Sequence, residues 1–229
     1  MEDYQESPKY KDRQDAGLVL AEKLLPYRQA KPVIIAIPNG GVAVAVPIAR
    51  KLVCPIHLMV VRKLQIPDEP EAGFGAVASD GTLILNEPLV KRLDLSETII
   101  ARQKERALKT IRARLARYGP AAEFPELKGM TAILVDDGLA SGFTMEVAVT
   151  VVKRQEPKAV IVAVPTSSMS AYRRISPLVD RLLCPDVSRL PIFAVANAYT
   201  EWRDLEDREI EELLGRIGHS TRRQIPAKS

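Results

Sequence analysis

One stretch of the sequence decides the fold: Ala132-Ile133-Leu134-Val135-Asp136-Asp137-Gly138-Leu139-Ala140-Ser141-Gly142-Phe143-Thr144-Met145. Its apolar start predicts a buried strand, two adjacent carboxylates mark the end of that strand, and small residues lead into a helix. Carboxylates in this position can accept hydrogen bonds from the vicinal hydroxyls of a sugar. Backbone N–H groups from Gly138 to Gly142 can bind a phosphate, helped by the amino end of the helix and by Thr144. The stretch therefore predicts a sugar-phosphate site.

This pattern differs from the common nucleotide-binding loops. A Walker A loop requires a lysine after its second glycine, and this stretch contains none. No Gly-x-Gly-x-x-Gly fingerprint follows a predicted strand. A strand that ends in a simple Asp-Gly turn before a capped helix would explain part of the stretch. The combination of two acids, two glycines, Ser141 and Thr144 favours phosphate binding instead.

Strands and helices alternate along the rest of the chain. Apolar runs predict buried strands over 33–37, 56–61, 131–135 and 159–164. Helices are expected over 12–25, 42–52 (where 42–46 also fits a strand), 97–118, 143–155, 167–173 and 202–214. We expect 64–81 to form an irregular loop and then short strands near 75–78 and 82–85, with another strand near 192–195 and a mobile tail beyond 215. This alternation predicts an α/β fold with a parallel, doubly wound sheet.

The composition narrows the class of protein. With 229 residues, 46% of them hydrophobic, the chain is long enough to bury one full core. The apolar runs are too short to span a membrane, and the polar start Met1-Glu2-Asp3-Tyr4 does not resemble a secretion signal. The cysteines Cys54 and Cys184 lack metal-ligand spacing. These features favour a cytoplasmic protein with reduced thiols and no membrane partner.

Positive charge is concentrated on one predicted helix. The formal net charge of +4 suits a polyanionic substrate and would also suit nucleic acid. On the amphipathic helix over 97–118, seven cations accompany a single acid between 102 and 117: Arg102, Lys104, Arg106, Lys109, Arg112, Arg114 and Arg117, against Glu105. A solvated face is the simpler interpretation of such a run, and contact with nucleic acid is the alternative.

The stretch around Asp136 resembles the signature of the type I phosphoribosyltransferases, which use phosphoribosyl pyrophosphate. Two more segments support this resemblance. Pro38-Asn39-Gly40-Gly41 follows the strand over 33–37, where the family has its pyrophosphate-binding loop. Val60-Val61-Arg62-Lys63 is similar to the strand end at which adenine and orotate members carry Arg-Lys before a mobile loop. Asp12-Arg13, Asp15-Ala16-Gly17 and the segment 71–78 look most like a less characterised branch of the family.

The resemblance implies both a fold and a reaction. The fold would have a phosphoribosyltransferase core over 1–166 and, within the same domain, a small hood and C-terminal helix over 167–229. The enzyme would transfer the phosphoribosyl group to a nitrogenous base, release pyrophosphate and act in nucleotide salvage as a homodimer. Mg²⁺ would be the cofactor, held by substrate and water near Asp136 and Asp137. The segment 64–73 would close over the site and exclude water.

The resemblance also implies roles for individual residues. Asp136 and Asp137 would orient the ribose and stabilise the positive charge that develops on it. The 5′-phosphate would be bound by Gly138, Leu139, Ala140, Ser141, Gly142 and Thr144, and the pyrophosphate by Asn39, Gly40, Gly41, Arg62 and Lys63. The candidates for binding the base are Thr166, Ser167, Tyr199 and Trp202, although the two aromatic side chains would equally serve to dock the last helix. These motifs are expected to converge at the carboxyl edge of the sheet.

Two positions depart from better-known members of the family. Ala140 stands where hypoxanthine-guanine enzymes have an aspartate, which argues against specificity for 6-oxopurines. Asn39 stands where the less characterised branch has an arginine, so the pyrophosphate loop has one cation fewer. The main alternative is a regulatory protein that senses phosphoribosyl pyrophosphate and binds nucleic acid through the basic helix. A hydrolase that releases ribose 5-phosphate is a third interpretation.

Overall fold

The computed structural model describes residues 7–67 and 69–221. Its centre is a five-stranded sheet with the strand order β2-β1-β6-β7-β9, and all neighbouring strands are parallel. The strands are β1 (Pro32–Ala36), β2 (Ile56–Leu58), β6 (Thr131–Val135), β7 (Ala159–Ala163) and β9 (Arg181–Leu183). This sheet confirms the parallel, doubly wound α/β fold that the sequence predicts.

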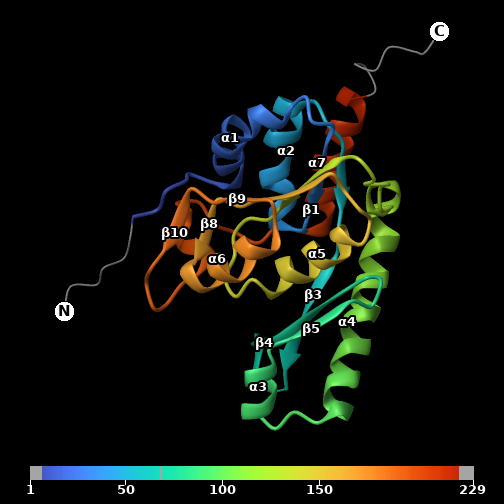
Figure 1. Cartoon of the computed structure of the whole chain (residues 1–229), viewed down its shortest axis with the longest axis vertical. Coiled ribbons are helices and arrows are strands. Elements are labelled where there is room, and N and C mark those ends of the chain that lie inside the picture. The colour runs from blue at the N-terminus through green and yellow to red at the C-terminus, as the bar shows by residue number, and fades with distance from the viewer. Residues whose placement is uncertain (1–6, 68, 222–229) are drawn as a thin grey trace.

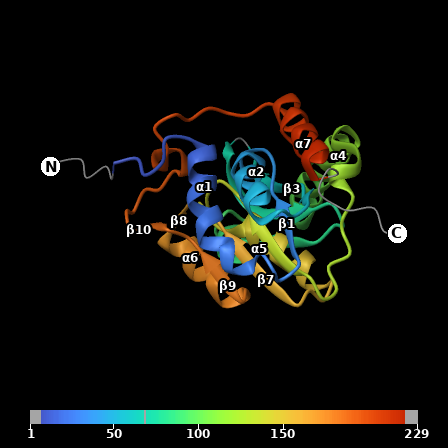
Figure 2. The ribbon, with the colours of Figure 1, turned by 90° about the horizontal axis from the view of Figure 1, so that it is seen from above.

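Helices cover both faces of the sheet (Figures 1 and 2). One face packs against α1 (Arg13–Leu24) and α2 (Gly40–Leu52), and the other against α5 (Phe143–Lys153) and α6 (Met169–Ile175). Successive strand residues enter opposite hydrophobic clusters, as Ile34 and Ile35 of β1 do. Because both faces of these strands are buried, their sequences are continuous apolar runs.

The first two helices pack closely together. Asp12 caps α1 by accepting a hydrogen bond from the Asp15 N–H at 2.8 Å. The segment 42–52 is helical rather than extended, and Pro47 lies inside α2. A Cβ atom on Gly17 would lie 2.9 Å from the Pro47 Cγ, so only glycine fits at this contact. The Asp15-Ala16-Gly17 motif thus serves the packing of α1 on α2.

Residues 61–92 form an antiparallel extension, which we call the hairpin lobe. It contains β3 (Val61–Ile66), β4 (Glu69–Ala78), β5 (Leu83–Leu85) and α3 (Glu87–Arg92), and it lies beside the first part of α4 (Glu97–Tyr118) (Figure 1). Two predictions are wrong here. The run 56–61 is not one strand, because the chain leaves the main sheet after Leu58. The segment 64–73 is not an irregular loop, because β3 pairs with β4 as far as Ile66, with irregularities at Gln65.

The C-terminal part differs most from the sequence prediction. A two-stranded parallel sheet joins β8 (Thr166–Ser168) to β10 (Asp186–Ser188), so α6 begins two residues later than expected, at Met169. No strand forms over 192–195, where a bend leads into a 3₁₀ turn over Val195–Ala198. The last helix, α7 (Asp207–Thr221), starts after the predicted 202 and extends beyond the predicted 214.

The expected mobile tail therefore begins in helix, and residues 222–229 lie outside the described part of the chain, as does the polar start Met1-Glu2-Asp3-Tyr4. The carboxyl end of α4 lies beside α7, as both views show (Figures 1 and 2). Within residues 7–67 and 69–221, no helix combines the length and apolar character needed to cross a membrane.

Candidate functional site

Two carboxylates follow β6 at its carboxyl end. The Asp137 N–H donates a hydrogen bond to Asp136 Oδ1 at 2.8 Å. Burial, and then the neighbouring charge of Asp137, raise the pKa of Asp136 well above its ordinary value. A second ionised carboxylate is thus unfavourable here unless a cation or hydrogen-bond donor compensates it. A ligand that supplies a cation or hydrogen-bond donors would therefore stabilise the ionised pair.

The loop after β1 lies directly against this acid pair. The Pro38–Asn39 peptide bond in this loop is cis. A Cβ atom on Gly40 would overlap the Asp137 carboxylate. One on Gly41 would lie 2.6 Å from the Val135 carbonyl oxygen. Both contacts require glycine, and they show that the structure brings the Asn39-to-Gly41 motif and the acid pair together.

The loop after the acids offers backbone donors. Leu139 is fixed to β8, because its N–H donates to the Thr166 carbonyl oxygen at 3.0 Å. Gly142 adopts a φ of +81° and precedes the first turn of α5. Among the described residues, no protein acceptor binds the N–H groups of Ala140, Ser141 and Gly142 or the hydroxyl of Thr144. These groups are therefore available to an oxyanion at a helix amino end.

A cation that sequence reasoning missed lies beside this loop. The Arg174 guanidinium stacks over the Phe143 ring at 3.9 Å from its centre, and its Nη1 atom pairs with Glu146 Oε2 at 3.0 Å. A Cβ atom on Gly142 would lie 3.1 Å from the Arg174 Cδ. The contact also explains the bulky Phe143, which is buried rather than directed into the loop. Only the fold reveals this arrangement, because α6 supplies the arginine.

The Asn39 side chain connects the loop to two helices. Its Nδ2 donates to the Leu205 carbonyl oxygen at 2.5 Å and to Asp207 Oδ1 at 3.2 Å. The Tyr118 hydroxyl, at the end of α4, donates to Asn39 Oδ1 at 3.2 Å and to Asp207 Oδ1 at 2.9 Å. The Asn39 amide thus holds α4 and α7 against the loop.

Arg62 and Lys63 belong to β3 of the hairpin lobe, which begins shortly after β2 leaves the main sheet. They line a hollow of about 140 Å³ between this lobe and α4, together with Gln65, Gln103, Arg106, Ala107 and Thr110. Burial, and then the nearby Arg114, lower the pKa of Arg62, whereas Asp207 and Tyr118 oppose this shift. Arg62 is thus electrostatically linked to the network around Asn39, and binding of pyrophosphate by Arg62 and Lys63 stays a prediction.

The four candidates for binding the base have different surroundings. Thr166 and Ser167 are fully buried, and their hydroxyls donate to Asp186 Oδ2 at 2.7 Å and to a backbone carbonyl at 2.9 Å, respectively. Tyr199 is buried, and its hydroxyl donates to the Asp137 carbonyl oxygen at 2.6 Å. Trp202 is 38% exposed and lines a cavity. Of the four, Trp202 is therefore best placed to meet a ligand.

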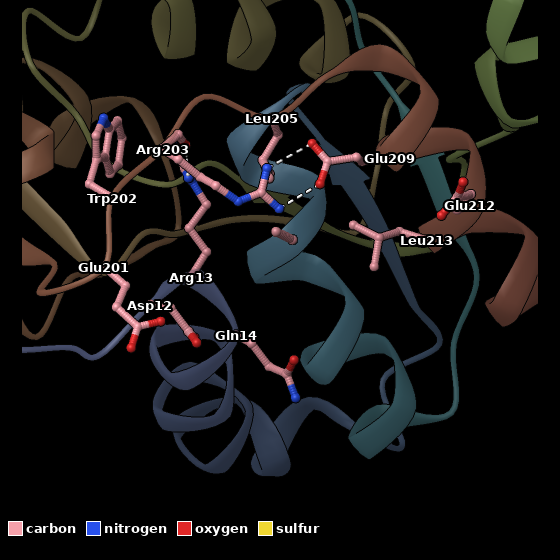
Figure 3. Close-up of a pocket in the computed structure, with 11 residues that line it drawn as sticks. Asp12, Arg13, Gln14, Glu201, Trp202, Arg203, Leu205, Glu209, Glu212 and Leu213 are labelled. Carbon is pink, nitrogen blue, oxygen red and sulfur yellow. Dashed lines mark hydrogen bonds and ion pairs between the residues drawn. The ribbon is translucent and has the colours of Figure 1, made fainter.

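The cavity beside Trp202 has a volume of about 480 Å³ (Figure 3). It lies between α1, α2, the segment 201–205 and α7, and its lining consists of Asp12, Arg13, Gln14, Ala43, Glu201, Trp202, Arg203, Leu205, Glu209, Glu212 and Leu213. Arg13 links it to the acids, because its Nε lies 2.8 Å from Asp137 Oδ2. Sequence reasoning noticed Arg13 only within a motif and gave it no role. A ligand in this cavity would meet Arg13, which connects the cavity to Asp137, whereas neither Asp136 nor Asp137 belongs to its lining.

Known proteins share this fold and sequence pattern. The family model for the phosphoribosyl transferase domain matches residues 13–200. A "putative phosphoribosyl transferase" of Mycobacterium tuberculosis, found in strains CDC 1551 and H37Rv, is 32% identical over 207 residues. The match covers 90% of this chain and 46% of that protein, so the chain spans about half the length of these relatives.

Solved structures agree with this result. The crystal structure of the TT1426 protein from Thermus thermophilus has a TM-score of 0.73 and 33% identity, over 90% of this chain and 97% of that one. The AQ2163 protein of Aquifex aeolicus, at 12% identity and a TM-score of 0.50, shares the fold over 76% of this chain and 74% of that one. With its parallel sheet of the type I phosphoribosyltransferase kind and a family match over most of its length, this chain belongs to the phosphoribosyl transferase domain family.

Proposed function

We propose that this protein transfers a phosphoribosyl group from phosphoribosyl pyrophosphate to a nitrogenous base. One observation carries the proposal: Gly40 and Gly41 lie against Asp136 and Asp137, and the uncommitted N–H groups of the next loop follow directly. A sugar with vicinal hydroxyls, a 5′-phosphate and a pyrophosphate at C1 offers a partner for each of these three parts. The alternative, a regulatory protein that senses phosphoribosyl pyrophosphate, would use the same donor site but would bind no acceptor base.

Each part of the site has a chemical task in this reaction. The C1–N bond to the base forms while the C1–O bond breaks, so the electron pair leaves on pyrophosphate and the nitrogen loses its proton. Asp136 and Asp137 accept hydrogen bonds from the ribose hydroxyls and stabilise the positive charge that develops on the ring. The backbone N–H groups of Ala140, Ser141 and Gly142 hold the 5′-phosphate, and those of Asn39 and Gly40 hold the departing pyrophosphate. The Gly41 N–H does not take part, because it donates to the Ile37 carbonyl oxygen at 3.1 Å.

The acid pair also fits a divalent cation. Carboxylate oxygens are ligands that Mg²⁺ prefers, and the ion usually retains water and takes substrate oxygens as well. Within the described residues, no group of three or more His, Cys, Asp or Glu side chains could hold a metal ion. We therefore propose that Mg²⁺ binds mainly through substrate and water near Asp136 and Asp137, where it supplies positive charge to the leaving pyrophosphate.

The acceptor side of the site is formed by the C-terminal part. We propose that residues 167–229 act as a hood within the same domain as 1–166, because Tyr199 binds the Asp137 backbone and Trp202 lines a cavity together with Arg13, the partner of Asp137. An aromatic face next to the ribose suits a planar base. Dimerisation, a cytoplasmic location and a place in nucleotide salvage are expectations from the resemblance alone.

The test is release of pyrophosphate from phosphoribosyl pyrophosphate and Mg²⁺ in the presence of single purine, pyrimidine and pyridine bases. We expect release that depends on one class of base and is lost in the variant with both Asp136→Asn and Asp137→Asn. Asp204→Asn, at an exposed carboxylate, is the matched control and should leave the rate unchanged. Base-independent formation of ribose 5-phosphate would contradict a transferase and favour a hydrolase.

A further inference from the structure

Arg13 is a buried cation at the first position of α1. Its side chain is 9% exposed, which is rare for an arginine. Besides the ion pair with Asp137, its Nη1 donates to the Arg203 carbonyl oxygen at 2.7 Å. Its guanidinium carbon lies 3.9 Å from the centre of the Trp202 ring, and Figure 3 shows the side chain reaching from α1 toward these two residues. Three independent contacts thus fix one flexible side chain.

On the basis of the proposed function, we propose that Arg13 is a positioning residue for the sugar of the donor. Arg13 and Gly40 both contact Oδ2 of Asp137, so this oxygen is enclosed by protein on two sides. In this proposal, the other oxygen, Oδ1, accepts the hydrogen bond from a ribose hydroxyl. Because the same guanidinium is bound by Trp202 and Arg203, the C-terminal segment sets the orientation of the acid that binds the ribose.

A lysine cannot reproduce this arrangement. The guanidinium is planar and donates from Nε and Nη1 in fixed directions, one to Asp137 and one to Arg203. An ammonium group is a compact charge without this fork, so it would keep the charge near Asp137 and lose the orientation. Lysine at position 13 therefore separates the effect of charge from the effect of positioning.

The experiment compares three ligands by calorimetric titration: phosphoribosyl pyrophosphate with Mg²⁺, ribose 5-phosphate, and inorganic pyrophosphate with Mg²⁺. Pyrophosphate has no ribose, so it reports on the rest of the site. In Arg13→Met we expect the two ribose ligands to bind at least about tenfold more weakly, as for loss of a charged hydrogen bond. The affinity of Arg13→Met for pyrophosphate should change by less than about twofold. The affinity of Arg13→Lys for the ribose ligands should lie between those of wild type and Arg13→Met.

Arg112→Met is the matched control. It removes an exposed arginine side chain that pairs with Glu105 within α4, away from Arg13 and the acid pair. We expect it to leave all three affinities unchanged. Trp202 is the single tryptophan of the chain, so its fluorescence should shift in Arg13→Met and thereby verify that the stacking contact was lost in a folded protein.

Two results would overturn the inference. Unchanged or tighter binding of the ribose ligands in Arg13→Met would mean that Arg13 has no role or competes with the sugar. An equal loss of all three ligands would mean that Arg13 only supports the fold. Absence of phosphoribosyl pyrophosphate binding by the unsubstituted protein would instead contradict the proposed function, and the inference would fall with it.

Discussion

At the scale of single residues, Asp136 and Asp137 are adjacent in sequence and opposite in their surroundings. Asp137 has a cation at 2.8 Å, whereas Asp136 receives one backbone N–H and is destabilised as an anion by burial and by its neighbour. Such a pair attracts a cationic or hydrogen-bonding ligand. When the site is empty, the same pair lowers the stability of the folded protein. Function and stability are therefore expected to oppose one another at Asp136.

Asp136→Asn should raise the melting temperature of the free protein at pH 7. A carboxyl whose pKa is raised on folding destabilises the folded state above that pKa, and asparagine keeps the oxygen that accepts the Asp137 N–H. The advantage should disappear below the ordinary pKa of an aspartate, about 4. Thermal unfolding of Asp136→Asn and wild type at pH 7 and below about pH 4 measures this difference.

Asp137→Asn should instead lower the melting temperature at pH 7, because it leaves Arg13 buried without its partner.

Gly40→Ala should remove donor binding and lower the free energy of unfolding by about 1–3 kcal/mol, the usual effect of overpacking. The reason is steric, because the added Cβ would overlap the Asp137 carboxylate. Gly215→Ala is the matched control: Gly215 lies in α7 with open space around it, so alanine should stabilise slightly. Normal donor affinity in Gly40→Ala would contradict the contact between the loop and the acids.

The sequence predicts which motifs of the candidate donor site lie together better than it predicts the surroundings of these motifs. Strand ends that face one sheet edge bring the Asn39 loop and Asp136 together, and this follows from local pattern. The partners Arg13 and Arg174 come from helices remote in sequence, and no periodicity indicates which side chain they meet. The sequence predicts one strand before Arg62, whereas the apolar run 56–61 is divided between two different sheets.

At the scale of elements, α4 is held against α7 by some of the same arginines whose charge raised the possibility of nucleic-acid binding. Arg114 and Arg117 both pair with Asp207 of α7, at 3.3 and 3.4 Å. Arg112 pairs with Glu105 within α4 at 2.7 Å. Three of the seven cations thus have partners within the chain. The basic run is explained in part by packing of α4 on α7, which weakens the argument for a nucleic-acid surface.

Asp207→Asn should loosen α7 and lower the free energy of unfolding by about 1–3 kcal/mol at pH 7. Burial alone would raise the pKa of Asp207, but the Tyr118 hydroxyl and the charge of Arg114 lower it. An acid with a lowered pKa stabilises the fold above its unfolded value, and this contribution is lost as pH falls through the folded value.

The difference between wild type and Asp207→Asn should therefore shrink below about pH 4, as denaturant titrations at several pH values would measure. Glu211→Gln removes a more exposed partner of Arg117 and should change stability by less than about 0.5 kcal/mol. A pH-independent difference between wild type and Asp207→Asn would contradict the ionic role of Asp207.

At the scale of the whole molecule, the candidate donor site draws on residues that are far apart in the sequence. α1, the loop after β1, the end of β6 and the segment around Trp202 all contribute. The sequence predicts β1, β6 and β7 because each is a continuous apolar run, but it misses β9 at the edge of the sheet. It also predicts short strands where β5 and the end of β4 form, but not β3 or the irregular segment 189–206, whose conformation depends on tertiary contacts such as Tyr199 with Asp137.

The chain should unfold in a single cooperative transition. Residues 167–229 contribute β9 to the central sheet and bind the acid pair through Tyr199, so they should not unfold separately from 1–166. Differential scanning calorimetry and the fluorescence of Trp202 should give coincident midpoints. A separate early transition seen only by Trp202 would show that the hood is an independent unit.

The most direct test of the central claim is calorimetric titration of the protein with phosphoribosyl pyrophosphate in the presence of Mg²⁺. The account predicts saturable binding by the wild type and by Asp204→Asn, and none by the protein that carries both Asp136→Asn and Asp137→Asn. Absence of binding by the wild type, or equal binding by the double variant, would contradict a donor site built on these two acids.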